Sequence, residues 1–149
     1  MNRIWKLSNK EIDETEKVFE FLLNERKDFK ECLKDVKTPE EKFAEIFNYF
    51  NFYLLGLCGC GAPDNTIEVI RDYLNIVKVN HERNFNEGEK LLKEIFDVNN
   101  VCLDPVLQFM AYTLDDKELT DHGNNISGAW ITDLGEALLW CFNIYIKNN

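Results

Sequence analysis

Two cysteines and three closely spaced glycines share the short stretch from Gly56 to Asn65. Glycines let the backbone take left-handed conformations, and free N–H groups at the start of a helix attract anions. The stretch is not a P-loop, because the Lys-Ser/Thr ending is absent and Asp64 places a negative charge where an anion would bind. It allows either a plain helix C-cap with a tight turn or a loop that binds an anion or nucleotide through Cys58, Gly59, Cys60, Gly61 and Asn65.

The cysteines, histidines and serines lack the spacing of a metal site or a catalytic set. Structural zinc sites use cysteine pairs two to four residues apart with a matching second pair, and Cys58-X-Cys60 has no such companion. Ser127 is not in a Gly-X-Ser-X-Gly turn, and His122 follows Asp121 directly, whereas neighbours in sequence rarely face each other. We therefore expect a protein without enzymatic activity, metal or cofactor, in which cysteines serve as small buried hydrophobes.

The segment from Leu119 to Gly135 departs most clearly from helical patterning and is the better candidate for a binding surface. It follows an acidic stretch, contains a glycine-rich turn and ends in a tryptophan, which is either an anchor of the turn or an exposed contact residue. The candidate binding residues are Asp115, Asp116, Glu118, Asp121, His122, Asn124, Asn125 and Trp130.

The net charge of −10 is unevenly distributed along the chain. Residues 101–149 hold two Lys/Arg against seven Asp/Glu, so the negative field lies mainly at the C-terminal end. Binding a phosphate backbone requires Lys and Arg, so this field disfavours direct nucleic-acid binding and anionic membranes. It favours a protein partner with a basic surface.

The positions of the apolar residues predict an all-helical bundle of about six helices in a single domain over residues 1–149. Ser8 with Glu11, Thr38 with Glu41 and Asn65 with Glu68 have the capping-box spacing. The helix over 39–57 is apolar around most of its circumference, which is typical of a central helix. We expect helices over residues 8–36, 39–57, 65–79, 86–98, 104–115 and 132–147, the first of them either straight or bent near Asn24.

A short β-hairpin or a winged-helix-like turn is expected immediately before the last helix. Ile126, Gly128 and Trp130 alternate as in a short strand, and Thr132 has the position of an N-cap. The apolar-Thr-X-X-Gly pattern that ends at Gly135 is similar to the strand-to-helix exit of winged-helix domains. The last helix is apolar on nearly all faces, so it either passes through the core or forms a homo-oligomer contact.

The motif Cys-Gly-Cys-Gly-Ala-Pro at 58–63 and the motif His-Gly-Asn-Asn-Ile-Ser-Gly-Ala-Trp-Ile-Thr-Asp-Leu-Gly at 122–135 accompany an aromatic helix. Over roughly residues 40–140 the chain resembles small uncharacterised proteins encoded by bacteriophages and prophages of low-GC Gram-positive bacteria. The resemblance implies a cytoplasmic accessory protein that acts on host machinery, and it supplies no catalytic residues.

The first residues lack a signal peptide's apolar region, and no apolar run is long enough to span a membrane, so we expect a cytoplasmic protein without membrane contact. The leading hypothesis is a non-enzymatic, acidic interaction protein, such as a phage inhibitor that docks a basic host surface. The alternative is a small-ligand binder in which the Gly56–Asn65 loop and the Leu119–Gly135 turn form one site.

Overall fold

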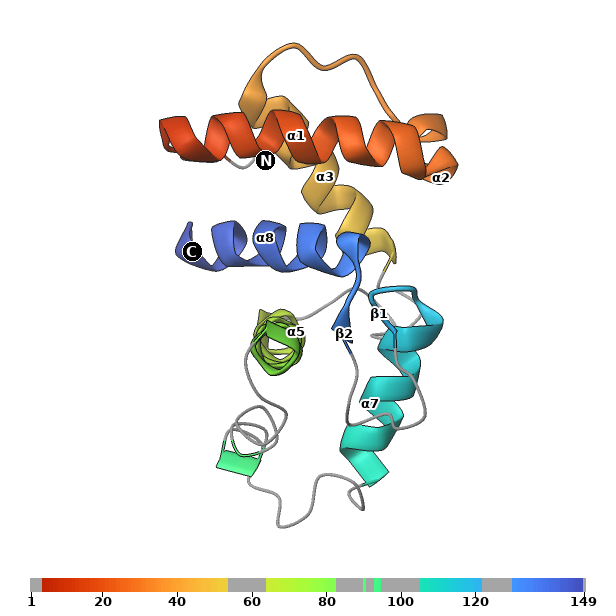
Figure 1. The fold of residues 1–149 in the computed structure, drawn as a ribbon. Helices are drawn as coiled ribbons and strands as arrows, with labels where there is room; N and C mark the ends of the chain where they lie inside the picture. Colours follow the sequence, from red (N-terminus) through yellow and green to blue (C-terminus); the bar gives the residue numbers. More distant parts are fainter. Residues whose placement is uncertain are drawn as a thin grey trace. The chain divides into compact units, whose positions relative to one another are not determined.

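The computed structural model of the protein describes residues 4–53, 64–82, 90, 93–94, 105–121 and 130–148. These residues form six helices and one two-stranded antiparallel sheet, which confirms the all-helical fold class with a hairpin before the last helix (Figure 1). They divide into two compact units, one of Met1–Pro63 with Cys141–Asn149 and one of Asp64–Trp140. The single domain expected over residues 1–149 stays a prediction.

The first unit begins with α1 (Asn9–Glu25), whose start follows the predicted capping box. The Ser8 hydroxyl accepts a hydrogen bond from the Glu11 N–H at 3.2 Å, and the Glu11 carboxylate accepts one from the Ser8 N–H at 2.8 Å. Thr15, Phe19 and Leu22 follow at helical spacing and are all buried. The capping box therefore sets where α1 begins, and the apolar stripe sets which face of the helix is buried.

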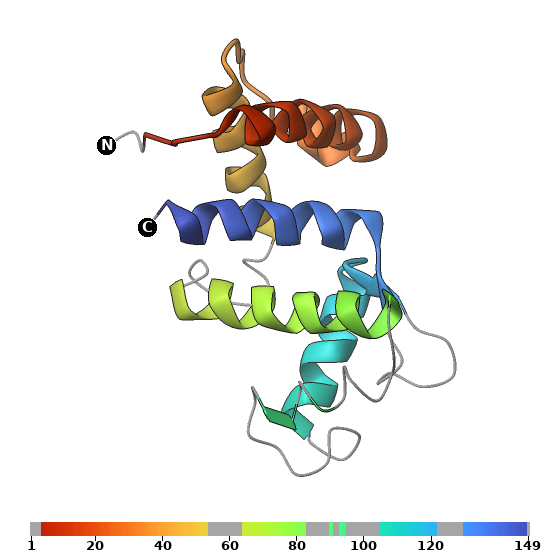
Figure 2. The same cartoon turned by 60° about the vertical axis from the view of Figure 1, so that its left-hand side comes forward.

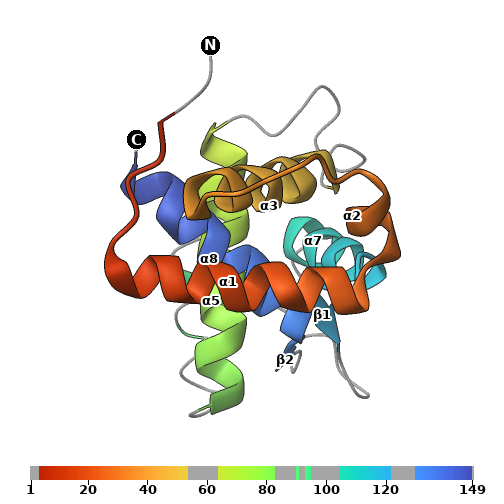
Figure 3. The same ribbon diagram turned by 90° about the horizontal axis from the view of Figure 1, so that it is seen from above.

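The long helix predicted over residues 8–36 is wrong, because the chain breaks at Arg26 (Figure 3). Arg26 has extended backbone (φ −125°, ψ 100°), and only the five-residue α2 (Lys27–Glu31) follows it. The Arg26 guanidinium Nε donates to the Tyr49 hydroxyl at 3.1 Å, and that hydroxyl donates to both Asp28 carboxylate oxygens at 3.0 and 3.1 Å. Burial raises the pKa of Tyr49 to about 12, against the opposing effect of Arg26, so the hydroxyl stays protonated and able to donate.

Helix α3 (Pro39–Tyr53) starts at the predicted proline, with a modified cap. The Thr38 hydroxyl accepts from the Glu41 N–H at 3.1 Å, but the Glu41 carboxylate accepts from Lys37 rather than from Thr38. The helix buries Phe43, Ile46 and Phe50. Phe52, in contrast, is 74% exposed, so the face of α3 that carries it is not covered.

The segment before α1 is attached to the C-terminal end of α8 (Asp133–Lys147) (Figure 2). The Lys6 N–H donates to the Asn148 side-chain oxygen at 2.9 Å, and the Asn148 amide donates back to the Lys6 carbonyl at 3.3 Å. Trp5 packs edge-on against Phe43, and Tyr145 stacks on Phe47 with ring centres 4.6 Å apart. Aromatic packing and backbone hydrogen bonds thus join both ends of the described chain.

The second unit contains α5 (Asp64–Glu82), α7 (Pro105–Asp116), β1 (Thr120–Asp121), β2 (Trp130–Ile131) and the first half of α8. α5 begins at Asp64, so Asn65 is the second residue of the helix and not the N-cap that the sequence predicted. Of the helix expected over 86–98, the structure describes residues 90, 93 and 94, which are helical. Among the described residues of this unit, the buried apolar side chains are Ile67, Ile70, Tyr73, Leu74, Ile76, Val77, Ala111, Leu114, Leu119, Leu134, Ala137, Leu138 and Leu139.

Most apolar side chains of α8 are buried within a single chain, among them Leu138, Cys141 and Phe142, while Trp140 and Ile146 are half-buried. Burial raises the pKa of the Cys141 thiol well above its usual value, so Cys141 is an unreactive core residue. A homo-oligomer contact through this helix stays a prediction.

The Glu11 carboxylate makes the stability of the fold depend on pH. Burial by itself raises the pKa of Glu11, but hydrogen bonds from Lys147 and from Ser8 outweigh burial and leave the pKa below its usual value. A carboxylate with a lowered folded-state pKa stabilises the fold fully above its unfolded-state pKa of 4.5. That contribution disappears as the pH falls through the folded-state pKa.

We therefore expect Glu11→Gln to lower the free energy of unfolding at pH 7 by about 1 kcal/mol. The difference from the wild type should shrink below pH 4.5, where the wild-type carboxylate also becomes neutral. Urea denaturation at pH 7, 5 and 3.5 measures it. Asp13→Asn, at an exposed position of the same helix, is the matched control and should show neither effect. A pH-independent loss in Glu11→Gln would contradict the assignment.

Candidate functional site

The end of α7, the turn after it and β1 present most of the acidic residues that the sequence singled out. The side chains of Asp116, Glu118 and Asp121 are exposed, and we call these three residues the acidic edge. They come from three different local structures: a helix end, a turn and a strand. What holds these structures together decides whether the carboxylates form one surface.

The turn after α7 is a Schellman motif with an unusual residue at its left-handed position. The Leu119 N–H donates to the Leu114 carbonyl and the Glu118 N–H donates to the Asp115 carbonyl, both at 3.0 Å. Leu114 and Leu119 are both buried, as the motif's apolar contact requires. Glu118 takes a φ of 62°, where glycine is the usual residue and a side chain costs about 1 kcal/mol.

Thr132 fastens this turn to the start of α8. Its hydroxyl donates to the Glu118 carbonyl at 2.6 Å and accepts from the Gly135 N–H at 3.0 Å, which makes it the predicted N-cap. Its own N–H donates to the Leu119 carbonyl at 3.1 Å. One threonine therefore satisfies groups of the turn and of the helix at the same time.

A glycine is required at position 135 because the backbone of α8 packs closely against the backbone of Leu119. A β-carbon at position 135 would lie 2.0 Å from the Leu119 carbonyl oxygen and 2.8 Å from the Ile131 side chain. Real β-carbons do not approach backbone atoms so closely. The first turn of α8 can reach the turn at Glu118 and Leu119 only because residue 135 has no side chain.

The hairpin places Trp130 next to the acidic edge. The register pairs Asp121 with Trp130 and Thr120 with Ile131. Side chains of directly opposed residues leave the sheet on the same face, a few ångströms apart. Asp121 is exposed and Trp130 is half-buried, so the indole lies partly against the protein and partly at the surface.

Asp115 has a different setting from the acidic edge. It is half-buried at the last turn of α7, and its negative charge adds to the effect of burial in raising the pKa of Tyr73 to about 12. Asp115 therefore lies near the interior of its unit. Two exposed carboxylates of the first turns of α8, Asp133 and Glu136, add to the negative field, and Glu136 pairs with Lys78 at 3.7 Å.

The remaining candidate residues lie largely outside the described part of the chain. This holds for His122, Asn124 and Asn125 of the turn. It also holds for Cys58, Gly59, Cys60 and Gly61 of the alternative ligand loop, while Asn65 belongs to α5. The proposed meeting of the two glycine-containing segments stays a prediction.

The described residues contain neither a metal-binding cluster nor a membrane-spanning helix. They contain no group of three or more His, Cys, Asp or Glu side chains that could hold a metal ion. Among the described helices, none combines the length and the apolar character needed to cross a membrane. Of the described cysteines, Cys32 is exposed and Cys141 is buried, both as free thiols.

Sequence reasoning identified the acidic residues and the cap but missed what positions them. The left-handed backbone at Glu118 has no signal in residue type, since glutamate is rare there. Gly135, within the first turn of a predicted helix, was the one residue that could have indicated this packing. A glycine destabilises a helix, so its presence there suggests that another segment of backbone packs closely against it.

Comparison of the chain with protein-family models, with curated proteins and with solved structures gave no match.

Gly135→Ala tests the packing of α8 on the turn. In an unobstructed helix this change stabilises the fold, but here the new methyl group meets the Leu119 carbonyl, and we expect a loss of about 3 kcal/mol. Urea denaturation measures the difference. Asn143→Ala, at an exposed position of the same helix, should change stability by less than about 0.5 kcal/mol. A stabilised Gly135→Ala variant would show that the close approach is absent.

Proposed function

We propose that the chain is a non-enzymatic interaction protein whose acidic edge docks a basic surface of a partner protein. The observation that carries the proposal is Glu118, an exposed carboxylate held at a φ of 62°. Glycine would relieve that strain, so a charged side chain at this position lowers the stability of the fold. We take an exposed charged side chain at such a strained position as the mark of a contact surface.

The surroundings of Glu118 support the same proposal. Its carbonyl is fixed by the Thr132 hydroxyl and its neighbour Leu119 is buried, so the carboxylate starts from a rigid backbone. A rigid donor or acceptor loses little conformational entropy on binding. Asp116 and Asp121 flank it along the chain and are also exposed.

Trp130 gives the acidic edge an apolar neighbour. Half-buried tryptophans beside charged groups are frequent contact residues at protein interfaces, because the ring contributes area while its backbone is already ordered. Charges at an interface mainly increase the association rate and select the partner, whereas an aromatic ring contributes more to affinity. Together they suit a basic surface with an apolar depression.

The resemblance to proteins of bacteriophages and prophages leads us to propose a bacterial host protein as the partner. In that role the chain is an accessory or inhibitor that covers a basic functional surface of the host. Proteins that bind nucleic acid have such basic surfaces, and the net charge of −10 attracts these proteins at long range.

Charge reversal of the acidic edge tests the proposal. We expect Asp116→Lys combined with Glu118→Lys and Asp121→Lys to reduce capture of the partner from a lysate of a low-GC Gram-positive bacterium about tenfold. Capture is quantified by mass spectrometry with tagged protein as bait. Asp115 is left unchanged because it lies near Tyr73 in the interior.

The matched control reverses three exposed carboxylates of α1, Asp13→Lys, Glu20→Lys and Glu25→Lys, with the same change in net charge. Equal loss in both triple variants would show that only net charge matters, which contradicts a defined site. A partner that is captured equally by all three proteins would contradict the acidic edge itself.

Glu118 permits a second test in which stability and binding move in opposite directions. Glu118→Gly relieves the left-handed strain, so we expect the free energy of unfolding to rise by about 1 kcal/mol while partner capture falls. Glu118→Ala also removes the carboxylate but keeps the strain, so it should lose capture without gaining stability. Urea denaturation and the same capture assay measure both. Full capture by Glu118→Gly would contradict a role for the side chain.

A further inference from the structure

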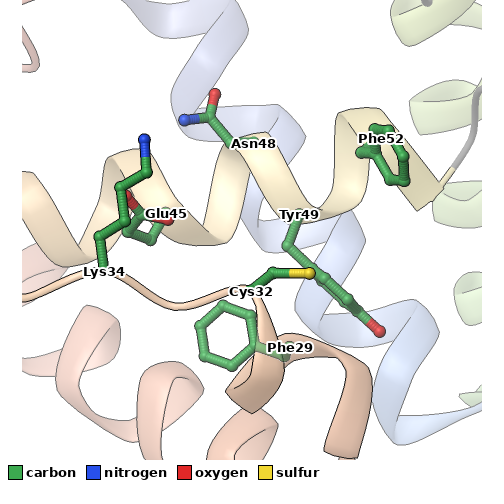
Figure 4. Close-up of a pocket in the computed structure, with 7 residues that line it drawn as sticks. All are labelled: Phe29, Cys32, Lys34, Glu45, Asn48, Tyr49 and Phe52. Carbon is green, nitrogen blue, oxygen red and sulfur yellow. The ribbon is translucent and has the colours of Figure 1, made fainter.

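Helix α3 borders two hollows in the first unit, and the two hollows adjoin each other. One has a volume of about 310 Å³ and lies between α3, α2 and the segment after α2 (Figure 4). The other, of about 780 Å³, continues toward the segment before α1. Both are lined by Lys34, Glu45 and Asn48, so we treat them as one groove and call it the α3 groove.

The α3 groove has an exposed apolar side chain toward each end. Ile4 is 85% exposed and lines the larger hollow, and Phe52 is 74% exposed and lines the smaller one. Among the described residues these are the two most exposed large hydrophobic side chains. Single exposed apolar residues are ordinary, but two in one concave surface indicate a contact region.

The charge of the α3 groove is predominantly negative. Asp35, Glu40, Glu41 and Glu45 line it, against the single ammonium group of Lys34. The Glu41 carboxylate already accepts the Lys37 N–H. In the part of the chain that the structure describes, no ion pair or hydrogen bond engages the other three carboxylates. An occupant with Lys or Arg would be electrostatically complementary.

A row of side chains along one face of α3 sets the length of a ligand that would fill the groove. Glu40, Ala44, Asn48 and Phe52 are four residues apart and all line the groove. At about 1.5 Å per residue the row is about 18 Å long, which is the length of a helix of about twelve residues. Ala44 in the row leaves room for close packing of a second helix.

We propose that the α3 groove binds a short amphipathic helix of a partner protein, with apolar residues toward Ile4, Ala44 and Phe52 and with flanking Lys or Arg. This is helix-in-groove recognition, with apolar anchors at helical spacing and charges at the rim. The proposal goes beyond the acidic edge, since it uses other residues in the other unit and requires a helical, basic ligand.

The test uses a synthetic peptide of about 14 residues made of Leu and Lys at amphipathic helical spacing. Its counterpart replaces every Lys by Glu. Both are titrated into the full isotope-labelled chain and followed by NMR. We expect the Lys peptide to bind at least about tenfold more tightly than the Glu peptide and to shift the amide signals of Ala44, Asn48 and Phe52.

Two variants separate the α3 groove from the general negative charge of the protein. We expect Glu40→Gln with Glu45→Gln to weaken the Lys peptide about tenfold, whereas Asp13→Asn with Glu20→Gln on α1 should not. Phe52→Ala should also weaken it about tenfold, whereas Tyr112→Ala, at a 57% exposed aromatic outside the groove, should not. All substituted side chains are at least partly exposed, so the fold is retained.

Two results would overturn the proposal: amide signal shifts that lie outside the groove, or an equal loss of peptide affinity in the groove variants and the control variants. Either result would show that the peptide binds through the net charge of the protein alone. Loss of peptide binding only in the Asp116→Lys, Glu118→Lys, Asp121→Lys protein would also overturn it and would leave the acidic edge as the binding surface. Retained peptide binding with loss of partner capture in that protein supports two separate surfaces.

Discussion

The Leu119 carbonyl oxygen lies only 2.0 Å from the position that a β-carbon of residue 135 would take, and the turn after α7, the hairpin and the start of α8 depend on that close approach. The same oxygen accepts the Thr132 N–H, while the Thr132 hydroxyl bridges the Glu118 carbonyl and the Gly135 N–H. These contacts fix the end of α7 against the start of α8. The hairpin register follows from them, because Thr120 and Ile131, the next residues outward, are already opposite each other.

This arrangement explains why a strained glutamate can persist at the surface. The Schellman hydrogen bonds and the buried Leu119 hold the turn in its left-handed conformation whatever residue occupies position 118. The stability lost at Glu118 is small beside the contributions of the buried residues around it. The exposed carboxylate of Glu118 is the basis of the proposal that this turn takes part in recognition.

Local rules account for what the sequence predicted well. The Ser8 and Thr132 caps and the proline starts of α3 and α7 each depend on residues within about four positions of one another. A bend was expected near Asn24, but the full break at Arg26 was not, and the Arg26 side chain there bonds to Tyr49, 23 residues away. Likewise the exposure of Phe52 could not be inferred from an apolar helix, since it depends on which neighbours cover each face.

The sequence by itself determined the helical fold class, most helix starts and the negative C-terminal field, since these follow from residue types at short spacing. Only the tertiary structure decided which carboxylates share a surface. It turned Asp115 toward Tyr73, set Asp121 opposite Trp130 and forced Glu118 into a left-handed turn. The physical reason is that these placements depend on contacts between residues far apart in the sequence. Glu118 and Thr132, for example, are 14 positions apart, and no local sequence pattern records their hydrogen bond.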